Sequence, residues 1–194
     1  RYAEVVEAFL QGLEQRAAMQ LSIDHLHSVA SFFVSRVDTK LDPQLDALKA
    51  ARPEAAALRG TIAIANAAQA FALFQQTLAS PRWQALAARG ARPQRPLWAS
   101  TSVKDPAYPD TMYVEQLIAE QTVNTLPPET FTAYRHHGRP AVRIDDAESQ
   151  APARLAALGA LGLDLREVTR ELEADGVAKF AGSFRSLLAG IEAK

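Results

Sequence analysis

The sequence predicts an α/β fold in which a parallel sheet is covered by helices. Three short runs of strand length carry this prediction, at residues 29–34, 95–101 and 122–126. Helical patterns separate the runs, and strands that alternate with helices form parallel sheets through right-handed crossovers. The first run, VASFFV, is apolar almost throughout rather than alternating, which is typical of a strand covered on both faces. We therefore expect three parallel, adjacent strands.

The remaining segments are predicted to be helical, in the order in which they occur. Apolar residues at helical spacing predict a helix over residues 2–19. Asp42 before Pro43 is a typical helix start and predicts a short helix that ends near residue 51. The longest helix is expected over residues 53–79, where many alanines favour close packing on a sheet. Further helices are expected at residues 83–88, 110–118 with Asp110 as its cap, 127–136, 148–161, 165–174 and 177–193, with an irregular segment at 138–146.

Composition narrows the class of protein. The 194 residues are enough for one domain, and 48% hydrophobic with 22% charged residues is ordinary for a globular protein. A net charge of -1 gives no electrostatic reason to expect nucleic acid or an anionic membrane as a partner. The absence of cysteine excludes disulfides, thiolate catalysis and cysteine-based zinc sites.

Two features of the sequence predict that the chain is cytoplasmic and that it is a fragment of a longer protein. No stretch approaches the ~20 apolar residues of a membrane span, and the first residues do not resemble a signal peptide. The sequence opens at Arg1 without a methionine and enters a helical pattern directly. Three parallel strands alone leave their edges uncovered. We therefore expect a missing segment of the same protein, rather than another chain, to complete the sheet.

Polar residues lie at or just beyond the ends of the first two predicted strands. Ser35, Arg36 and Asp38 come after the first strand; Ser100 lies at the end of the second strand, and Lys104 follows it. The carboxyl ends of parallel strands meet at one edge, where α/β folds place their chemistry. Structural roles remain open for the same residues. Arg36 can pair with Asp38 or a helix end, and Lys104 can pair with Asp105. Asn124 and Thr125, at the end of the third strand, can either reach the pocket or cap the next helix.

Other catalytic motifs are absent from the sequence. The histidines form two pairs, His25 with His27 and His136 with His137, and neither pair has further ligands at metal-binding spacing. There is no Gly-x-Ser-x-Gly nucleophile elbow, Gly-x-Gly-x-x-Gly motif or P-loop. We therefore expect neither a metal nor a cofactor.

Three segments, which follow one another along the chain, resemble segments of the transaldolases. They are HSVASFFVSRVD at 27–38, RPLWASTSVKDPAYPDTMYVEQLI at 95–118 and TVNTLP at 122–127. They are similar to the C-terminal part of the longer bacterial form, which some organisms fuse to glucose-6-phosphate isomerase. The resemblance covers nearly the whole chain and implies a TIM (β/α)8 barrel of the class I aldolase type. Residues 1–194 would then be a single partial domain, holding strands six to eight and extra C-terminal helices.

The resemblance also implies an activity. Transaldolases move a dihydroxyacetone unit from sedoheptulose 7-phosphate to glyceraldehyde 3-phosphate in the pentose phosphate pathway, through a Schiff base and without a cofactor. The family's Schiff-base lysine lies on strand four and its acid/base carboxylates on strands one and three. None of these is expected in this chain, so we assign it no catalytic residue and expect it to be inactive alone. Its partners would be sugar phosphates and the missing N-terminal half; homo-oligomerisation remains open.

The candidate substrate-binding residues follow from the same resemblance. Ser31, Phe33 and Arg36 match a Ser-x-Phe-x-x-Arg pattern that lines the pocket in the family, where the arginine meets the sugar's phosphate. A guanidinium suits this role because it donates two charge-assisted hydrogen bonds. Shorter transaldolases carry a second phosphate arginine after an Ala-Ser pair, and this sequence departs from that pattern. Here Lys104 is expected to replace it as a point charge, with Ser100 as a hydroxyl donor.

Two further hypotheses remain open on the sequence alone. One is a non-catalytic, helix-rich binding or assembly module that docks a partner through the alanine-rich helix at residues 53–79. The other is that Lys104 itself forms the Schiff base in a rearranged site.

Overall fold

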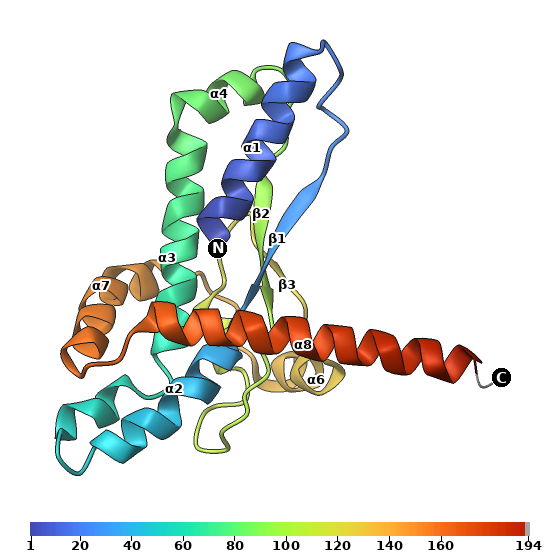
Figure 1. Cartoon of the computed structure of the whole chain (residues 1–194). Helices are drawn as coiled ribbons and strands as arrows, with labels where there is room; N and C mark the ends of the chain where they lie inside the picture. Colours follow the sequence, from blue (N-terminus) through green and yellow to red (C-terminus); the bar gives the residue numbers. More distant parts are fainter. Residues whose placement is uncertain (193–194) are drawn as a thin grey trace.

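A three-stranded parallel sheet lies at the centre of the computed structural model, which describes residues 1–192 (Figure 1). The strand order is β1-β2-β3, with β1 at Ser28–Phe33, β2 at Gln94–Ala99 and β3 at Val123–Asn124. Both neighbouring pairs are parallel. The prediction of three adjacent, parallel strands is therefore confirmed.

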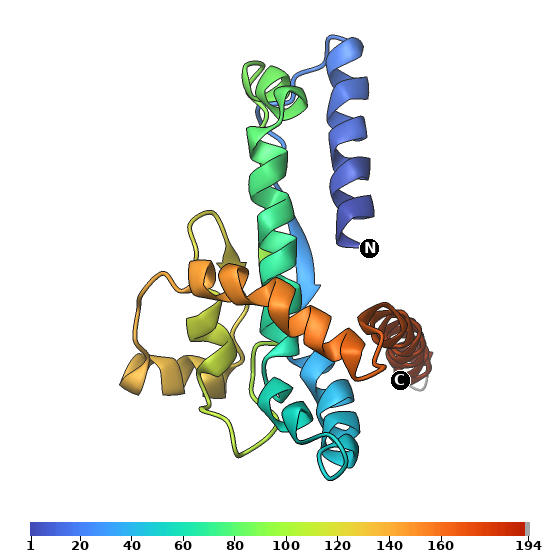
Figure 2. The same cartoon turned by 90° about the vertical axis from the view of Figure 1, so that its left-hand side faces the viewer.

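Helices connect the strands of this sheet and cover one of its faces. Figures 1 and 2 show α1 and α3 running alongside the sheet, and α8 crossing near the tips of the strand arrows. The helices are α1 (Tyr2–Ala18), α2 (Ser35–Leu48), α3 (Ile62–Ala79), α4 (Pro81–Ala87), α5 (Met112–Gln116), α6 (Pro128–His137), α7 (Ile144–Ala160) and α8 (Leu165–Glu192), with the 3-10 helix η1 (Pro53–Leu58).

The alanine-rich helix α3 packs inside the molecule. Its residues Ala65, Ala67 and Ala68 are fully buried, and α3 packs most extensively against α7. Small side chains allow the two helices to approach closely, which is why this surface is rich in alanine. These alanines are therefore buried within this chain and are not free to dock a partner, contrary to the hypothesis of a docking helix.

The sheet is covered on one face rather than on both, which corrects the prediction for the first strand. Ala30 and Trp98 are buried, and the Phe32 ring makes an edge contact with the Trp98 ring at 5.8 Å between centroids. Val29 and Phe33, which point to the opposite face, are each 41% exposed. β1 is also an edge strand, so its outer backbone groups have no neighbouring strand within residues 1–192.

The chain forms a helix earlier after β1 than predicted. α2 begins at Ser35 and contains Pro43, so Asp42 is not a helix cap. Val37, Leu41 and Leu45 recur every four residues and are almost completely buried. This buried stripe stabilises the helix enough to tolerate an exposed proline in its interior, where a backbone donor is lost.

Several other helix boundaries and caps differ from prediction, among them the start of α7, which begins at Ile144 within the segment predicted to be irregular. The helix expected over residues 53–79 is interrupted at Gly60, whose φ is +68°, and separates into η1 and α3. The last two predicted helices form one helix, α8, which at 28 residues is longer than α3. Gly176 does not interrupt it, and the predicted end at residue 193 lies outside the described residues. Asp110 does not cap α5; it accepts a hydrogen bond from, or pairs with, His137 at 2.8 Å.

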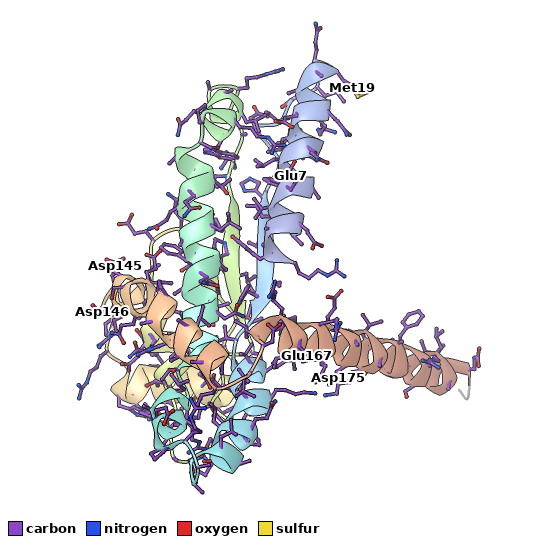
Figure 3. The ribbon with its side chains drawn as sticks, turned by 60° about the vertical axis from the view of Figure 1, so that its left-hand side comes forward. Glu7, Met19, Asp145, Asp146, Glu167 and Asp175 are labelled. Atoms are coloured by element: carbon purple, nitrogen blue, oxygen red, sulfur yellow. The ribbon has the colours of Figure 1, made fainter. Side chains whose placement is uncertain are left out.

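The first part of α8 contacts the body of the molecule and its second part extends away from it, as Figure 3 shows. Lys40 of α2 forms ion pairs with Glu171 at 2.8 Å and with Asp175 at 3.8 Å. Beyond these contacts, α8 carries an exposed apolar stripe at Val177, Phe180, Phe184, Leu187 and Ile191.

Candidate functional site

The carboxyl ends of the three strands meet at one edge of the sheet. Because the strands are parallel and in register, Phe33 and Ala99 end β1 and β2 side by side. The segments that carry Arg36 and Ser100 therefore leave the sheet at neighbouring points. The backbone confirms this, since the amide of Ser35 donates to the carbonyl oxygen of Ser100 at 3.0 Å.

Arg36 lies in the first turn of α2, immediately beyond β1. Its guanidinium carbon lies 4.3 Å from the centroid of the Phe33 ring, a cation–π contact that orients the side chain. No carboxylate within residues 1–192 lies at ion-pairing distance from this guanidinium. The alternative pairing with Asp38 is wrong, because Asp38 is buried and accepts hydrogen bonds from the Ala63 amide and the Tyr113 hydroxyl instead.

Ser31, Phe33 and Arg36 line a common groove of about 1190 Å³ along the open edge of β1. The N-terminal end of α1, part of α3 and the first part of α8 form its other walls. Most of the groove wall is apolar, and Arg36 is a charged group placed where the groove meets the carboxyl edge of the sheet. The structure thus brings these three predicted residues together.

Ser100 occupies a strained position directly after β2. Its φ is +56°, in the left-handed region that residues other than glycine seldom adopt. Its hydroxyl oxygen lies 3.1 Å from that of Ser35, which is almost completely buried. Such strain is common at functional sites, where the surrounding structure holds a residue in place.

Lys104 lies farther along the same loop and is exposed. Its ammonium donates to the hydroxyl of Ser102 at 2.6 Å. Asp105 does not pair with it but binds Arg59 at 2.6 Å, so the alternative of a Lys104–Asp105 pair is wrong. Neither Ser100 nor Lys104 lines the groove beside β1, and the predicted site residues therefore form two groups.

The residues at the end of β3 hydrogen-bond to the neighbouring loop and do not cap the next helix, α6. Asn124 accepts a hydrogen bond from the buried hydroxyl of Thr101 at 2.8 Å, which ties β3 to the loop after β2. The residue before α6 is Pro127, and no side chain caps this helix. The alternative in which Asn124 or Thr125 caps α6 is therefore wrong.

Within residues 1–192, no three His, Asp or Glu side chains are grouped so that they could bind a metal ion. Over the same range, the helices are all too short or too polar to cross a membrane.

Comparison with known proteins adds the family. The model of the transaldolase/fructose-6-phosphate aldolase family matches residues 1–191. The chain belongs to this family. It is 49% identical over 192 residues to a transaldolase of Frankia alni, covering 98% of this chain and 51% of the relative. A transaldolase of Parafrankia is 50% identical over 189 residues, covering 97% of this chain and 51% of the relative.

The transaldolase relatives are about twice as long as this chain. A third relative, transaldolase 1 of Streptomyces coelicolor, is 48% identical over 98% of this chain and 50% of its own length. The chain therefore spans about half the length of the curated transaldolases it matches. Membership of this family implies that the three-stranded sheet is a portion of a TIM barrel.

The sequence did not predict a buried network of hydrogen bonds that lies beneath the carboxyl edge of the sheet in this member of the transaldolase family. Asp38 is 1% exposed and accepts hydrogen bonds from the Ala63 amide at 2.7 Å and the Tyr113 hydroxyl at 2.9 Å. Burial raises the pKa of Asp38 to about 7 despite these donors. Asp42, one turn later, accepts a hydrogen bond from the Tyr108 hydroxyl at 2.7 Å. The signal was their four-residue spacing beside the apolar stripe of α2, which places both carboxylates on a buried side of the helix.

Proposed function

We propose that this chain is the C-terminal part of a cytoplasmic transaldolase, with β1, β2 and β3 as strands six to eight of its barrel. The full protein would transfer a dihydroxyacetone unit from sedoheptulose 7-phosphate to glyceraldehyde 3-phosphate in the pentose phosphate pathway. This chain would supply the side of the active site that binds the sugar phosphate. One observation carries the proposal: Arg36 lies at the carboxyl edge of the sheet with no carboxylate partner within residues 1–192.

Phosphate binding is the chemistry that Arg36 can supply. A guanidinium donates two parallel hydrogen bonds to phosphate oxygens, and contact with Phe33 restricts its side chain before the substrate arrives. A carboxylate neighbour would compete with the phosphate for the same donors. Ser31 and Phe33, which line the groove with Arg36, would form the wall beside the sugar.

Lys104 and Ser100 would contact phosphate from the neighbouring strand. Lys104 contributes a positive charge, and the hydroxyl of Ser100 is held at the end of β2 by its backbone conformation. Lys104 is exposed and bonded to Ser102, whereas a lysine that forms a Schiff base is commonly activated in an apolar or cationic pocket. These surroundings favour a binding role for Lys104, with the reactive amine supplied by the preceding part of the protein.

Replacing Arg36 in the full-length protein tests its role. We expect Arg36→Ala to raise the KM for both phosphorylated sugars by about ten- to a hundredfold, because charge-assisted hydrogen bonds contribute about 1.5–3 kcal/mol. Arg36→Lys should lie between wild type and Arg36→Ala. Arg92, which precedes β2 at the opposite edge of the sheet, provides the control Arg92→Ala, with an unchanged KM. An unchanged KM in Arg36→Ala would remove the assigned role.

The assignment of the reactive amine to the preceding half of the protein is tested separately. We expect no turnover from the isolated chain and restored turnover when the preceding half of the protein is added. Borohydride reduction with a ketose phosphate, followed by peptide mapping, identifies the lysine that forms the Schiff base. Turnover by the isolated chain, or trapping on Lys104, would refute the assignment of the amine to the preceding half.

A non-catalytic assembly module remains the second candidate, and the exposed apolar stripe of α8 favours it. Val177, Phe180 and Phe184 are each more than half exposed and lie on one side of the helix. The two candidates differ in their response to ligand. Sugar phosphate should raise the thermal stability of the full-length protein if it is a transaldolase and leave it unchanged if it is only a module.

A further inference from the structure

The loop after β2 is attached to α2 and to the turn before α3. The hydroxyl of Tyr108 donates to Asp42 Oδ2 at 2.7 Å, and Asp42 Oδ1 accepts a hydrogen bond from the amide of Gly60 at 3.2 Å. Asp42 is only 7% exposed. One buried carboxylate therefore connects three segments that are distant in the sequence.

The ring of Tyr108 is enclosed as well as hydrogen-bonded. Gly60 has a φ of +68°, and a Cβ atom added there would lie 2.8 Å from Tyr108 Cζ. The guanidinium carbon of Arg59 lies 5.6 Å from the centroid of the same ring. The ring therefore contacts a position where only glycine fits, with a cation beside it.

The loop is also fixed next to Lys104. Arg59 binds Asp105 at 2.6 Å, and Asp105 Oδ1 accepts a hydrogen bond from the Ala107 amide at 2.9 Å. On the other side of Lys104, the buried Ser102 accepts the hydrogen bond from its ammonium. We call the group that holds this loop the Tyr108 clamp: Asp42, Arg59, Gly60, Asp105 and Tyr108.

We propose that the Tyr108 clamp positions Lys104 for a substrate phosphate, which makes Tyr108 and Asp42 positioning residues of the site. The inference rests on the proposed phosphate-binding role of Lys104. Lysine has a flexible side chain, and an unattached loop would add backbone entropy to the cost of ordering it on binding. The clamp fixes the backbone that directly follows the lysine before the substrate arrives.

The test is Tyr108→Phe in the full-length protein, which removes one hydrogen bond and keeps the ring. We expect the KM for glyceraldehyde 3-phosphate to rise about three- to tenfold, in line with the loss of one partly buried hydrogen bond. The kcat should remain within about twofold, and the KM for unphosphorylated glyceraldehyde should not change. Asp42→Ala should produce the same pattern with an equal or larger rise, because it removes the acceptor of both the Tyr108 hydroxyl and the Gly60 amide. Tyr134→Phe is the matched control, because the Tyr134 hydroxyl forms no hydrogen bond within residues 1–192 and its loss should change neither KM.

A double variant shows whether the clamp acts through Lys104. Tyr108→Phe should raise the KM for the phosphorylated aldehyde in wild type and cause no further rise in a Lys104→Met background. Hydrogen exchange of residues 104–108 should become faster in Tyr108→Phe. An equal rise for both aldehydes, no rise for either, or an additive effect in the double variant would overturn the proposal.

The two levels of the proposal fail in different ways. If Lys104→Met alone leaves the KM unchanged, Lys104 does not bind phosphate and the positioning role falls with it. If Lys104→Met raises the KM and Tyr108→Phe does not, only the clamp is overturned. If full-length wild type does not catalyse the transfer, the proposed function itself is wrong, and that result precedes any variant.

Discussion

The two faces of the sheet differ in how far this chain completes them. On the covered face, Ala30 and Trp98 are buried under helices, and the indole nitrogen of Trp98 donates to the carbonyl oxygen of Leu117 at 3.1 Å. On the open face, Val29 and Phe33 of the same strand region are each 41% exposed. Parallel strands are normally buried on both faces. The open face therefore carries large apolar side chains without a cover for them within residues 1–192, which agrees with the proposed barrel.

The largest expected effect compares one aromatic residue from each face. Trp98→Ala should lower the free energy of unfolding of the 194-residue chain by about 3–5 kcal/mol, because it leaves a large cavity in a packed core. Phe33→Ala, on the open face, should lower it by less than about 1 kcal/mol. Urea unfolding measures both. Equal losses would show that the open face is covered in solution, for instance by a second copy of the chain.

The second largest expected effect is a loss of stability as the pH rises, caused by the buried carboxylate of Asp38 on the covered side of the sheet. Burial raises the pKa of Asp38 to about 7, above its usual value of 3.8, so the folded state favours the protonated form. The stability contributed by this proton is complete below about pH 4 and is lost as the pH rises through 7. At about 1.4 kcal/mol per pKa unit, the loss is about 2–4 kcal/mol. Urea unfolding between pH 4.5 and about 8 should show this loss in wild type and not in Asp38→Asn.

An exposed carboxylate provides the matched control for this pH series. A hydrogen bond and ion pair with Lys40 lower the pKa of Glu171. Its contribution is therefore present above its unfolded pKa and disappears as the pH falls, opposite in sign to that of Asp38. Glu171→Gln should keep the wild-type loss of stability towards high pH. If Glu171→Gln removes that loss, Asp38 is not its source.

Local signals in the sequence were sufficient for the strands and insufficient for several helix boundaries. Each predicted strand contains a few apolar residues between helical patterns, and all three strands are confirmed, although β3 is only two residues long. Pro43 is a common helix start, yet the buried stripe of α2 extends the helix through it. Gly60 interrupts a helix because its φ is positive, whereas Gly176 remains within α8. The difference depends on tertiary contacts, which the local sequence does not contain.

The candidate site shows the same division between features that local sequence signals predict and features that depend on tertiary contacts. Arg36 was predicted at the carboxyl edge because it follows a strand directly, and the structure places it there; its phosphate role remains a prediction. The hydrogen bond between Asp42 and Tyr108 joins residues 66 positions apart, and no motif within either segment indicates it. Residues next to strand ends can thus be placed from sequence, whereas the contacts that hold a loop depend on the three-dimensional fold.

The smallest expected effect contrasts a glycine held by packing with a glycine in the exposed part of α8. At Gly60, an added Cβ would strain a positive φ and contact the Tyr108 ring, so Gly60→Ala should lower the free energy of unfolding by about 1–2 kcal/mol. At Gly182, nothing lies within 4 Å of an added Cβ, and alanine favours the helix by about 0.5–1 kcal/mol. The same substitution should therefore change stability with opposite sign at the two positions. Thermal unfolding of both variants measures these two changes. If Gly182→Ala lowers the stability, the second part of α8 packs against another surface in solution and is not exposed to solvent.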